Sequence, residues 1–244
     1  ASDVPLNAVI GLRTSERVDP TSLDSVYLYD RTESRRVAVN RSLSEDGRGI
    51  QLTPQSPLNA SHHYRAYIGS SLYDLAGNLF NNSLRSNYYS YFDFTAGENS
   101  QTQTPQVIDH SLSQVTEAIA LNSWLRIQLD KPLHTLCVNN NTVTLRDSSD
   151  ADSDSIAGSV SLSDDQRLLT FNPTEDLAAN TDYTLTLSGI CDITGKVLDD
   201  YNLSFTTGDT ADTQVGTIQS YSPYHGASDV PLNAVIGLRT SERV

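Results

Sequence analysis

The residues with the clearest spacing for chemistry are four aspartates in one polar stretch, DSSDADSDS. They are Asp147, Asp150, Asp152 and Asp154. Asp-x-Asp-x-Asp is the spacing of the first ligands of a calcium loop, because this hard cation takes several carboxylate oxygens. The rest of that pattern is absent, since Ser161 occupies the position of the bidentate Glu. Two interpretations stay open: a calcium site, and a solvated loop between the predicted strands Val143–Arg146 and Ile156–Ser161.

No motif for catalysis accompanies this stretch. The sequence contains no GxSxG, HExxH or phosphate-binding loop. His62 and His63 are adjacent, and adjacent side chains on a strand point to opposite faces, so we do not expect them to share a metal. We therefore predict no catalytic residue and no enzyme, with calcium as the one candidate cofactor.

The composition argues against several partners. The net charge is −14, and Lys occurs only at Lys131 and Lys196. So acidic a surface repels nucleic acid phosphates and anionic lipid. No run of 18 apolar residues is present to cross a membrane. We expect no nucleic acid partner and no membrane insertion. The sequence also lacks Met and a signal peptide, which favours a segment of a longer protein.

The strands and loops that position these residues belong to a chain with an internal repeat. Ala1–Val18, ASDVPLNAVIGLRTSERV, returns letter for letter as Ala227–Val244. The chain therefore repeats with a period of 226 residues, counted from Ala1 to Ala227, and it includes the start of a second period.

Short apolar runs broken by Gly, Pro, Asn and Asp predict an all-β fold. Asp46–Gly47 is a hairpin signal, and Asp19 is expected to cap a helical turn around Leu23. The polar stretches Glu98–Pro105 and Gly208–Gly216 are expected to be linkers. The strands expected in the first half are Val9–Thr14, Val26–Tyr29, Val37–Val39, Ile50–Leu52, Tyr64–Ile68 and Tyr89–Phe94.

Two blocks of similar size carry the same order of short motifs. Gln51–Pro54 corresponds to Thr170–Pro173, and Tyr73–Asn78 corresponds to Cys191–Lys196. The blocks are thus two diverged copies of one fold. We expect one domain at 1–98, a second at 105–208, and the start of a further copy of the first at 215–244.

The first block reads Val4-Pro-Leu-Asn before an apolar strand, then Leu52-Thr-Pro, then Asp74-Leu-Ala-Gly-Asn, then Phe92-Asp-Phe-Thr. This order resembles the bacterial Ig-like domain of the S-layer-protein type. The second block follows it more loosely, with Asp192-Ile-Thr-Gly-Lys at the third motif. The resemblance covers nearly the whole chain and implies two tandem Ig-like Greek-key β-sandwiches. It also implies a secreted or cell-surface location, as in large bacterial adhesins.

The motif residues have a structural explanation. The Asp74 carboxylate can accept backbone N–H groups of a turn in which Gly77 takes a positive φ. Leu75 and Ile193 are expected to pack into the core beneath that turn. In each block a tyrosine follows a short turn, where its hydroxyl can hold the crossover loop, as in the tyrosine corner of Ig-like sandwiches; these are Tyr64 and Tyr183.

In an Ig-like frame, Cys137 and Cys191 fall in loops at the same pole of the second sandwich. The resemblance therefore makes a disulfide between them sterically plausible, and we favour it over two free thiols. Such a bridge, closing a loop from residue 137 to residue 191, would add about 4 kcal/mol in the chain-entropy account.

The first block lacks a strand that the second block has. Val107–Ser111 should be the first strand of the second block, whereas the first block has no such strand before Val4. The matching stretch, Gly216–Gly226, lies at the other end of the chain. A sandwich without an edge strand exposes unpaired backbone. Two interpretations stay open: the sequence boundary is drawn through a continuous fibre, or this stretch complements the edge of another copy, through Thr217, Ile218, Tyr221 and Tyr224.

Exposed tyrosines provide a different candidate contact. Tyr88, Tyr89 and Tyr91 follow a loop that the second block lacks, and alternate members must face outward. They could stack on the sugars of a polysaccharide or contact a host surface. Ordinary surface tyrosines on an edge strand are the other interpretation, and the one we favour.

The sequence therefore predicts a structural extender, or stalk repeat, of a long extracellular bacterial adhesin or surface fibre. Its partners would be neighbouring repeats or head-to-tail copies. Two alternatives stay open: a module that binds carbohydrate or a host surface, and a filament subunit joined by strand complementation.

Overall fold

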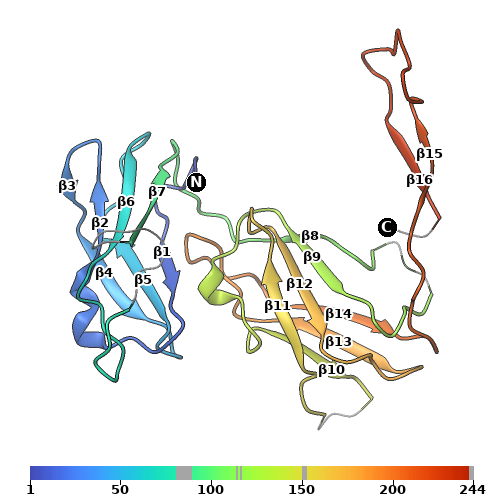
Figure 1. Ribbon diagram of the computed structural model, residues 1–244, viewed down its shortest axis with the longest axis horizontal. Helices are drawn as coiled ribbons and strands as arrows, with labels where there is room; N and C mark the ends of the chain where they lie inside the picture. Colours follow the sequence, from blue (N-terminus) through green and yellow to red (C-terminus); the bar gives the residue numbers. More distant parts are fainter. Residues whose placement is uncertain (81–89, 114, 116, 150–152, 242–244) are drawn as a thin grey trace.

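The structure of the protein is a computed structural model, and it describes residues 1–80, 90–113, 115, 117–149 and 153–241. The fold is all-β, as predicted, with two β-sandwiches in tandem followed by a hairpin (Figure 1). The two described helices are short 3₁₀ turns, and neither is long or apolar enough to cross a membrane.

The first domain is a sandwich of two antiparallel sheets. One sheet has the order β1-β5-β4 and the other β3-β2-β6-β7. Alternate residues of each strand face inward, and Leu28, Leu52 and Tyr64 are among the most buried. The strands are β1 (Ile10–Arg13), β2 (Val26–Asp30), β3 (Arg35–Arg36), β4 (Val39–Leu43), β5 (Gly49–Pro54), β6 (His63–Ile68) and β7 (Ser90–Thr95).

The second domain repeats this plan, also with seven described strands. Its sheets have the orders β11-β12-β9-β8 and β10-β13-β14. A core of buried aliphatic residues with Phe171 and Tyr183 lies between them. The strands are β8 (Val107–His110), β9 (Leu125–Leu129), β10 (Val143–Asp147), β11 (Gly158–Leu162), β12 (Leu168–Pro173), β13 (Asp182–Leu187) and β14 (Tyr201–Thr206).

Several local predictions are confirmed. The 3₁₀ helix η1 (Pro20–Ser25) begins after Asp19, whose carboxylate accepts the Thr21 N–H. The Tyr64 hydroxyl accepts the Asn59 N–H at 2.8 Å. In the second domain, the Tyr183 hydroxyl accepts the N–H of Ala178 at 3.0 Å. Each tyrosine thus holds its crossover loop, as in a tyrosine corner.

The turn after Asp74 also forms as predicted. One carboxylate oxygen of Asp74 accepts the N–H groups of Ala76 and Asn78, both at 2.8 Å, and Gly77 has a φ of 83°. In the second domain, the carboxylate of Asp192 makes the equivalent bonds.

Two predictions about the first domain are wrong. Leu75 does not pack into the core but is 63% exposed, because the turn directs it outward, and Leu72 is buried in its place. The strand expected at Val37–Val39 is also displaced. The chain pairs with β2 over Arg35–Arg36, the Val37 N–H still donates to the Leu28 carbonyl at 3.0 Å, and the chain joins the other sheet from Val39 onward.

Candidate functional site

The junction between the two domains is built on two glycines. Gly11 in β1 and Gly49 in β5 alternate with core-facing residues along their strands. A side chain at either position would therefore lie on the outer face of their sheet. A Cβ added to Gly11 would come within 2.7 Å of His134 Nε2, and one added to Gly49 within 2.8 Å of Leu136 Cδ2. The second domain therefore packs onto the outer face of the first domain's sheet where that face has no side chains.

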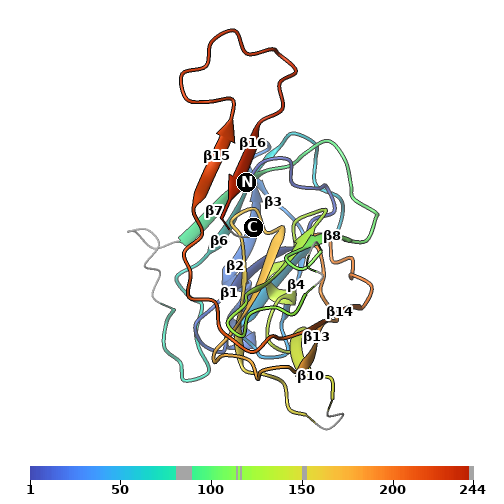
Figure 2. The same ribbon diagram turned by 90° about the vertical axis from the view of Figure 1, so that its right-hand side faces the viewer.

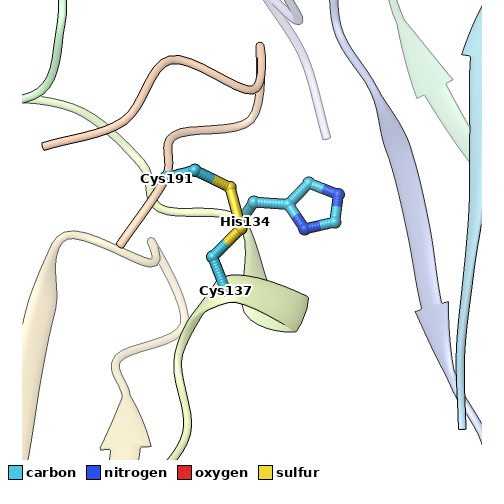
Figure 3. Close-up of side chains that lie close together, drawn as sticks. All are labelled: His134, Cys137 and Cys191. Atoms are coloured by element: carbon cyan, nitrogen blue, oxygen red, sulfur yellow. A yellow bond between two sulfur atoms is a disulfide. The ribbon is translucent and has the colours of Figure 1, made fainter. Parts of the chain in front are cut away.

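The contacting residues of the second domain come from η2 (Thr135–Cys137) and from the turn after Cys191. His134 caps η2, since its Nδ1 accepts the Leu136 N–H at 3.3 Å. Its ring points away from the disulfide and toward the strands of the first domain (Figure 3). On the other segment, the carbonyl of Ile193 accepts the Val9 N–H at 2.8 Å.

A disulfide joins these two contacting segments. Cys137 and Cys191 are bonded, with their Cα atoms 5.5 Å apart (Figure 3). The His134 N–H also donates to the Cys191 carbonyl at 2.8 Å. Both contacts with the first domain therefore lie on one cross-linked unit. Because the two thiols are oxidised, the group His134, Cys137 and Cys191 offers no pair of thiolate ligands to a metal.

Several hydrogen bonds hold the linker between the domains against both of them. The Asn7 amide donates to the Gln101 carbonyl and accepts the Gln101 N–H, at 2.7 and 2.9 Å. Lys131, largely buried, donates to the Gln103 carbonyl at 2.8 Å, and Pro105 is buried. The polar linker thus ends on a buried apolar residue. In the second domain, Asn122 exchanges the same pair of bonds with Asp212.

We expect His134 to make the stability of the junction depend on pH. Burial lowers the pKa of His134 below its usual range, and nearby Asp192 raises it only in part. His134 is 4% exposed, and its Nε2 has no hydrogen-bond partner among the described residues. Opening the junction would hydrate the ring and restore an ordinary pKa near 6.5. The open state therefore binds more protons below about pH 6.5, and the docked state loses stability as the pH falls from there.

We expect the radius of gyration to rise between about pH 7.5 and pH 5, measured by solution scattering. His134→Asn is the control, because Asn can still cap η2 but does not titrate. An equal response in that variant would show that another group controls the junction.

The predicted calcium ligands are only partly described. One oxygen of Asp147 accepts the Ser149 N–H and hydroxyl, at 2.8 and 2.6 Å, and these bonds lower the pKa of Asp147. Asp154 is exposed. Asp150 and Asp152 lie outside the described residues, so calcium binding stays a prediction.

The tyrosine contact is likewise partly outside the described residues, which exclude Tyr88 and Tyr89. Tyr91 lies on the outer face of its sheet, with the Arg65 guanidinium 3.6 Å from the ring centroid. Its neighbour Tyr67 stacks on Tyr27, 5.0 Å away between centroids. Cross-strand packing thus accounts for Tyr91, and binding to polysaccharide or a host surface stays a prediction.

The third predicted contact lies at the end of the chain. Ile218 and Tyr221 belong to β15 (Ile218–Ser222), which pairs with β16 (Gly237–Thr240). Thr217 precedes β15 and donates its N–H to the Ser241 hydroxyl at 2.8 Å. Tyr224 follows β15 and is exposed.

Two sandwiches joined by a fastened junction define a tandem Ig-like protein. The family model described as bacterial Ig-like domain matches residues 1–96 and 101–207. The chain belongs to this family. A comparison with curated proteins gives no match.

Among solved structures, domains 1–6 of the surface layer protein SbsC are 15% identical, with a TM-score of 0.32. The match covers 91% of this chain and 26% of that one. The N-terminal part of SbsC is 14% identical over 85% of this chain and 43% of that one, with a TM-score of 0.33. The titin fragment I67–I69 is 11% identical over 85% and 62%, with a TM-score of 0.24. The chain thus spans less than half of either SbsC structure.

Proposed function

We propose that this chain is a spacer segment of a bacterial surface protein, which sets the distance between other parts of that protein. The fastened junction is the observation that carries the proposal. A spacer sets a constant distance only if its domains keep a fixed relative orientation. Two features favour such an orientation: the contact of His134 and Leu136 with two glycines, and the hydrogen bonds that hold the linker.

Other features fit an extracellular location. A disulfide persists in an oxidising compartment outside the cytosol. A net charge of −14 keeps neighbouring repeats from associating sideways. Ala1–Val18 returns without a change, which fits duplication that lengthens the protein, since length in such proteins scales with repeat number.

Solution scattering of proteins with one, two and three periods of 226 residues tests the proposal. For a spacer, the maximum dimension should grow by a constant increment with each period, because each junction repeats one geometry. A compact particle, whose maximum dimension rises only with the cube root of mass, would contradict it. Repeating the series with calcium and with a chelator shows whether a cation stiffens the rod.

A further inference from the structure

The junction brings the outer face of one sheet against the end of the next sandwich. The receiving face of the first domain consists of three residues: Val9, Gly11 and Gly49. The contacting end of the second domain also consists of three residues: His134, Leu136 and Ile193. Because both domains share one fold, the second domain has its own receiving face and the first domain has its own contacting end.

The strand register identifies the receiving face of the second domain. β9 pairs with β12 as β1 pairs with β5, so the positions of the two sheets can be matched one by one. The equivalents of Val9, Gly11 and Gly49 are, in this order, Trp124, Arg126 and Leu168. Trp124 is 53% exposed. None of the ion pairs found among the described residues includes Arg126.

Matching hydrogen bonds identify the contacting end of the first domain. Asp19 caps η1 as His134 caps η2. In each domain the N–H of this capping residue donates at 2.8 Å to the carbonyl at the start of a later turn, that of Tyr73 or of Cys191. The equivalents of His134, Leu136 and Ile193 are, in this order, Asp19, Thr21 and Leu75.

These two surfaces are complementary in size. In the junction, the bulky side chains of His134 and Leu136 belong to the contacting end and lie against glycines. In the other pair of surfaces the order is reversed, because the bulky side chains of Arg126 and Leu168 belong to the receiving face and the smaller ones to the contacting end. A large residue meets a smaller one at both positions in either case, which allows close packing.

The two surfaces are also complementary in charge. Arg126 stands at the position of Gly11, and Asp19 stands at the position of the residue that Gly11 meets. Oδ1 of Asp19 accepts the N–H and the hydroxyl of Thr21, at 2.9 and 2.8 Å, whereas Oδ2 makes no hydrogen bond with a described residue. Oδ2 can therefore accept a charge-assisted hydrogen bond from the Arg126 guanidinium.

The backbone groups match as well. In the junction, the Val9 N–H donates to the Ile193 carbonyl. The equivalent groups, the Trp124 N–H and the Leu75 carbonyl, have no hydrogen-bond partner in the part of the chain that the structure describes. Leu75 is also 63% exposed. The same contact would therefore satisfy a free donor and a free acceptor and would cover two large apolar side chains.

We propose that the receiving face of the second domain holds the contacting end of the first domain of the next repeat. The order follows from the sequence, since the second domain is followed by Ala227–Val244, the start of another first domain. The hairpin of β15 and β16 belongs to that start and stands apart from both sandwiches, so it does not itself cover Trp124 (Figures 1 and 2). The contact rests on the spacer proposal, because it needs successive repeats in one protein.

The linkers support the same geometry at both places. Asn122 and Asp212 exchange the pair of bonds that Asn7 and Gln101 exchange before the second domain. β8 follows Gln101 at the same distance in sequence as β15 follows Asp212. The next first domain thus leaves the second domain from the same held position as the second domain leaves the first.

Fluorescence of Trp124, the only Trp of the chain, tests the contact. The protein has two periods of 226 residues, with Trp124→Phe in the second period. The remaining Trp124 should emit at shorter wavelength than in the single chain and be quenched less by acrylamide, because the next domain covers it. Arg126→Glu in the first period should abolish the difference, since it places a carboxylate opposite Asp19. Asp19→Asn in the second period should reduce it, because Asn keeps the cap of η1 but removes the charge.

The repeat provides the matched control. Arg126→Glu in the second period makes the same chemical change at a residue that no further first domain follows, and it should leave the emission of Trp124 unchanged. The single chain with Arg126→Glu gives the direct effect of the substitution on the Trp124 ring, whose centroid lies 5.7 Å from the guanidinium. Folding should be unaffected, because Arg126 is exposed.

The proposal is overturned if Trp124 emits alike in one and in two periods, or if Arg126→Glu acts alike in the first and the second period. The scattering series separates this result from the spacer function. A constant increment in the maximum dimension with an unchanged emission of Trp124 would keep the spacer and exclude this contact.

Discussion

Replacement of Cys137 and Cys191 by Ser should lower the stability of the second domain by about 4 kcal/mol, because the bridge restricts the unfolded chain over a separation of 54 residues. For a domain of this size, that loss lowers the melting temperature by roughly 15–30 °C. Calorimetry should show one transition, that of the second domain, moving down by this amount. The first domain contains no Cys, so its transition should move far less.

The doubly substituted domain should still fold. In the first domain, Ser22 and Tyr73 occupy the places of the two cysteines, and the Tyr73 N–H donates to the Ser22 hydroxyl at 3.1 Å. The same sandwich thus forms there without a bridge. A reducing agent should reproduce the shift in the unaltered protein and leave the Cys137→Ser, Cys191→Ser protein unchanged. A drop of only a few degrees would mean that the bridge adds little.

The same substitution should loosen the junction. The bridge ties η2, which contacts Gly11 and Gly49, to the segment whose Ile193 carbonyl accepts the Val9 N–H. Without the bridge, the two contacts can separate. Hydrogen exchange at the Val9 amide should therefore become faster in the doubly substituted protein, at a temperature where both domains remain folded.

Gly11→Arg should open the junction without unfolding either domain. The second domain carries Arg126 at the same position of its own sheet, so the sandwich itself accepts Arg there. At Gly11, however, the added atoms would meet His134 and Leu136. Overpacking of this kind costs about 1–3 kcal/mol, and a buried guanidinium without a partner costs more. We expect a larger radius of gyration and faster hydrogen exchange at Val9.

The repeat supplies a matched control. Gly237 is the same residue in the second copy of the sequence, and apart from its chain neighbours no described residue lies within 4 Å of the position that its Cβ would take. Gly237→Arg therefore makes the same chemical change, with the same net charge, away from the junction. If the two variants scatter alike, or if Gly11→Arg keeps the dimensions of the unaltered chain, the glycine contact does not hold the domains together.

Much of the fold within each domain followed from the sequence. Alternating apolar residues indicated the strands, Asp46–Gly47 marked a hairpin, and Tyr64 and Tyr183 marked the crossover loops. These patterns are informative because a strand repeats every two residues and a turn needs particular residue types. Leu75 shows the limit, because a turn has no such period, and the side to which an apolar residue points depends on the surrounding packing.

The junction could not be predicted in this way. Gly11 and Gly49 are far apart in the sequence, and each alone only weakens a strand signal. Their positions on neighbouring strands, two residues apart in the register, left the outer face without side chains at both sites, and Leu136 reached these sites only through the fold of the second domain. The sequence by itself determined the repeat, the sandwich class and the residues that hold each loop, because these are local patterns. Only the tertiary structure decided how one domain packs on the next, because that contact joins segments that no local pattern connects.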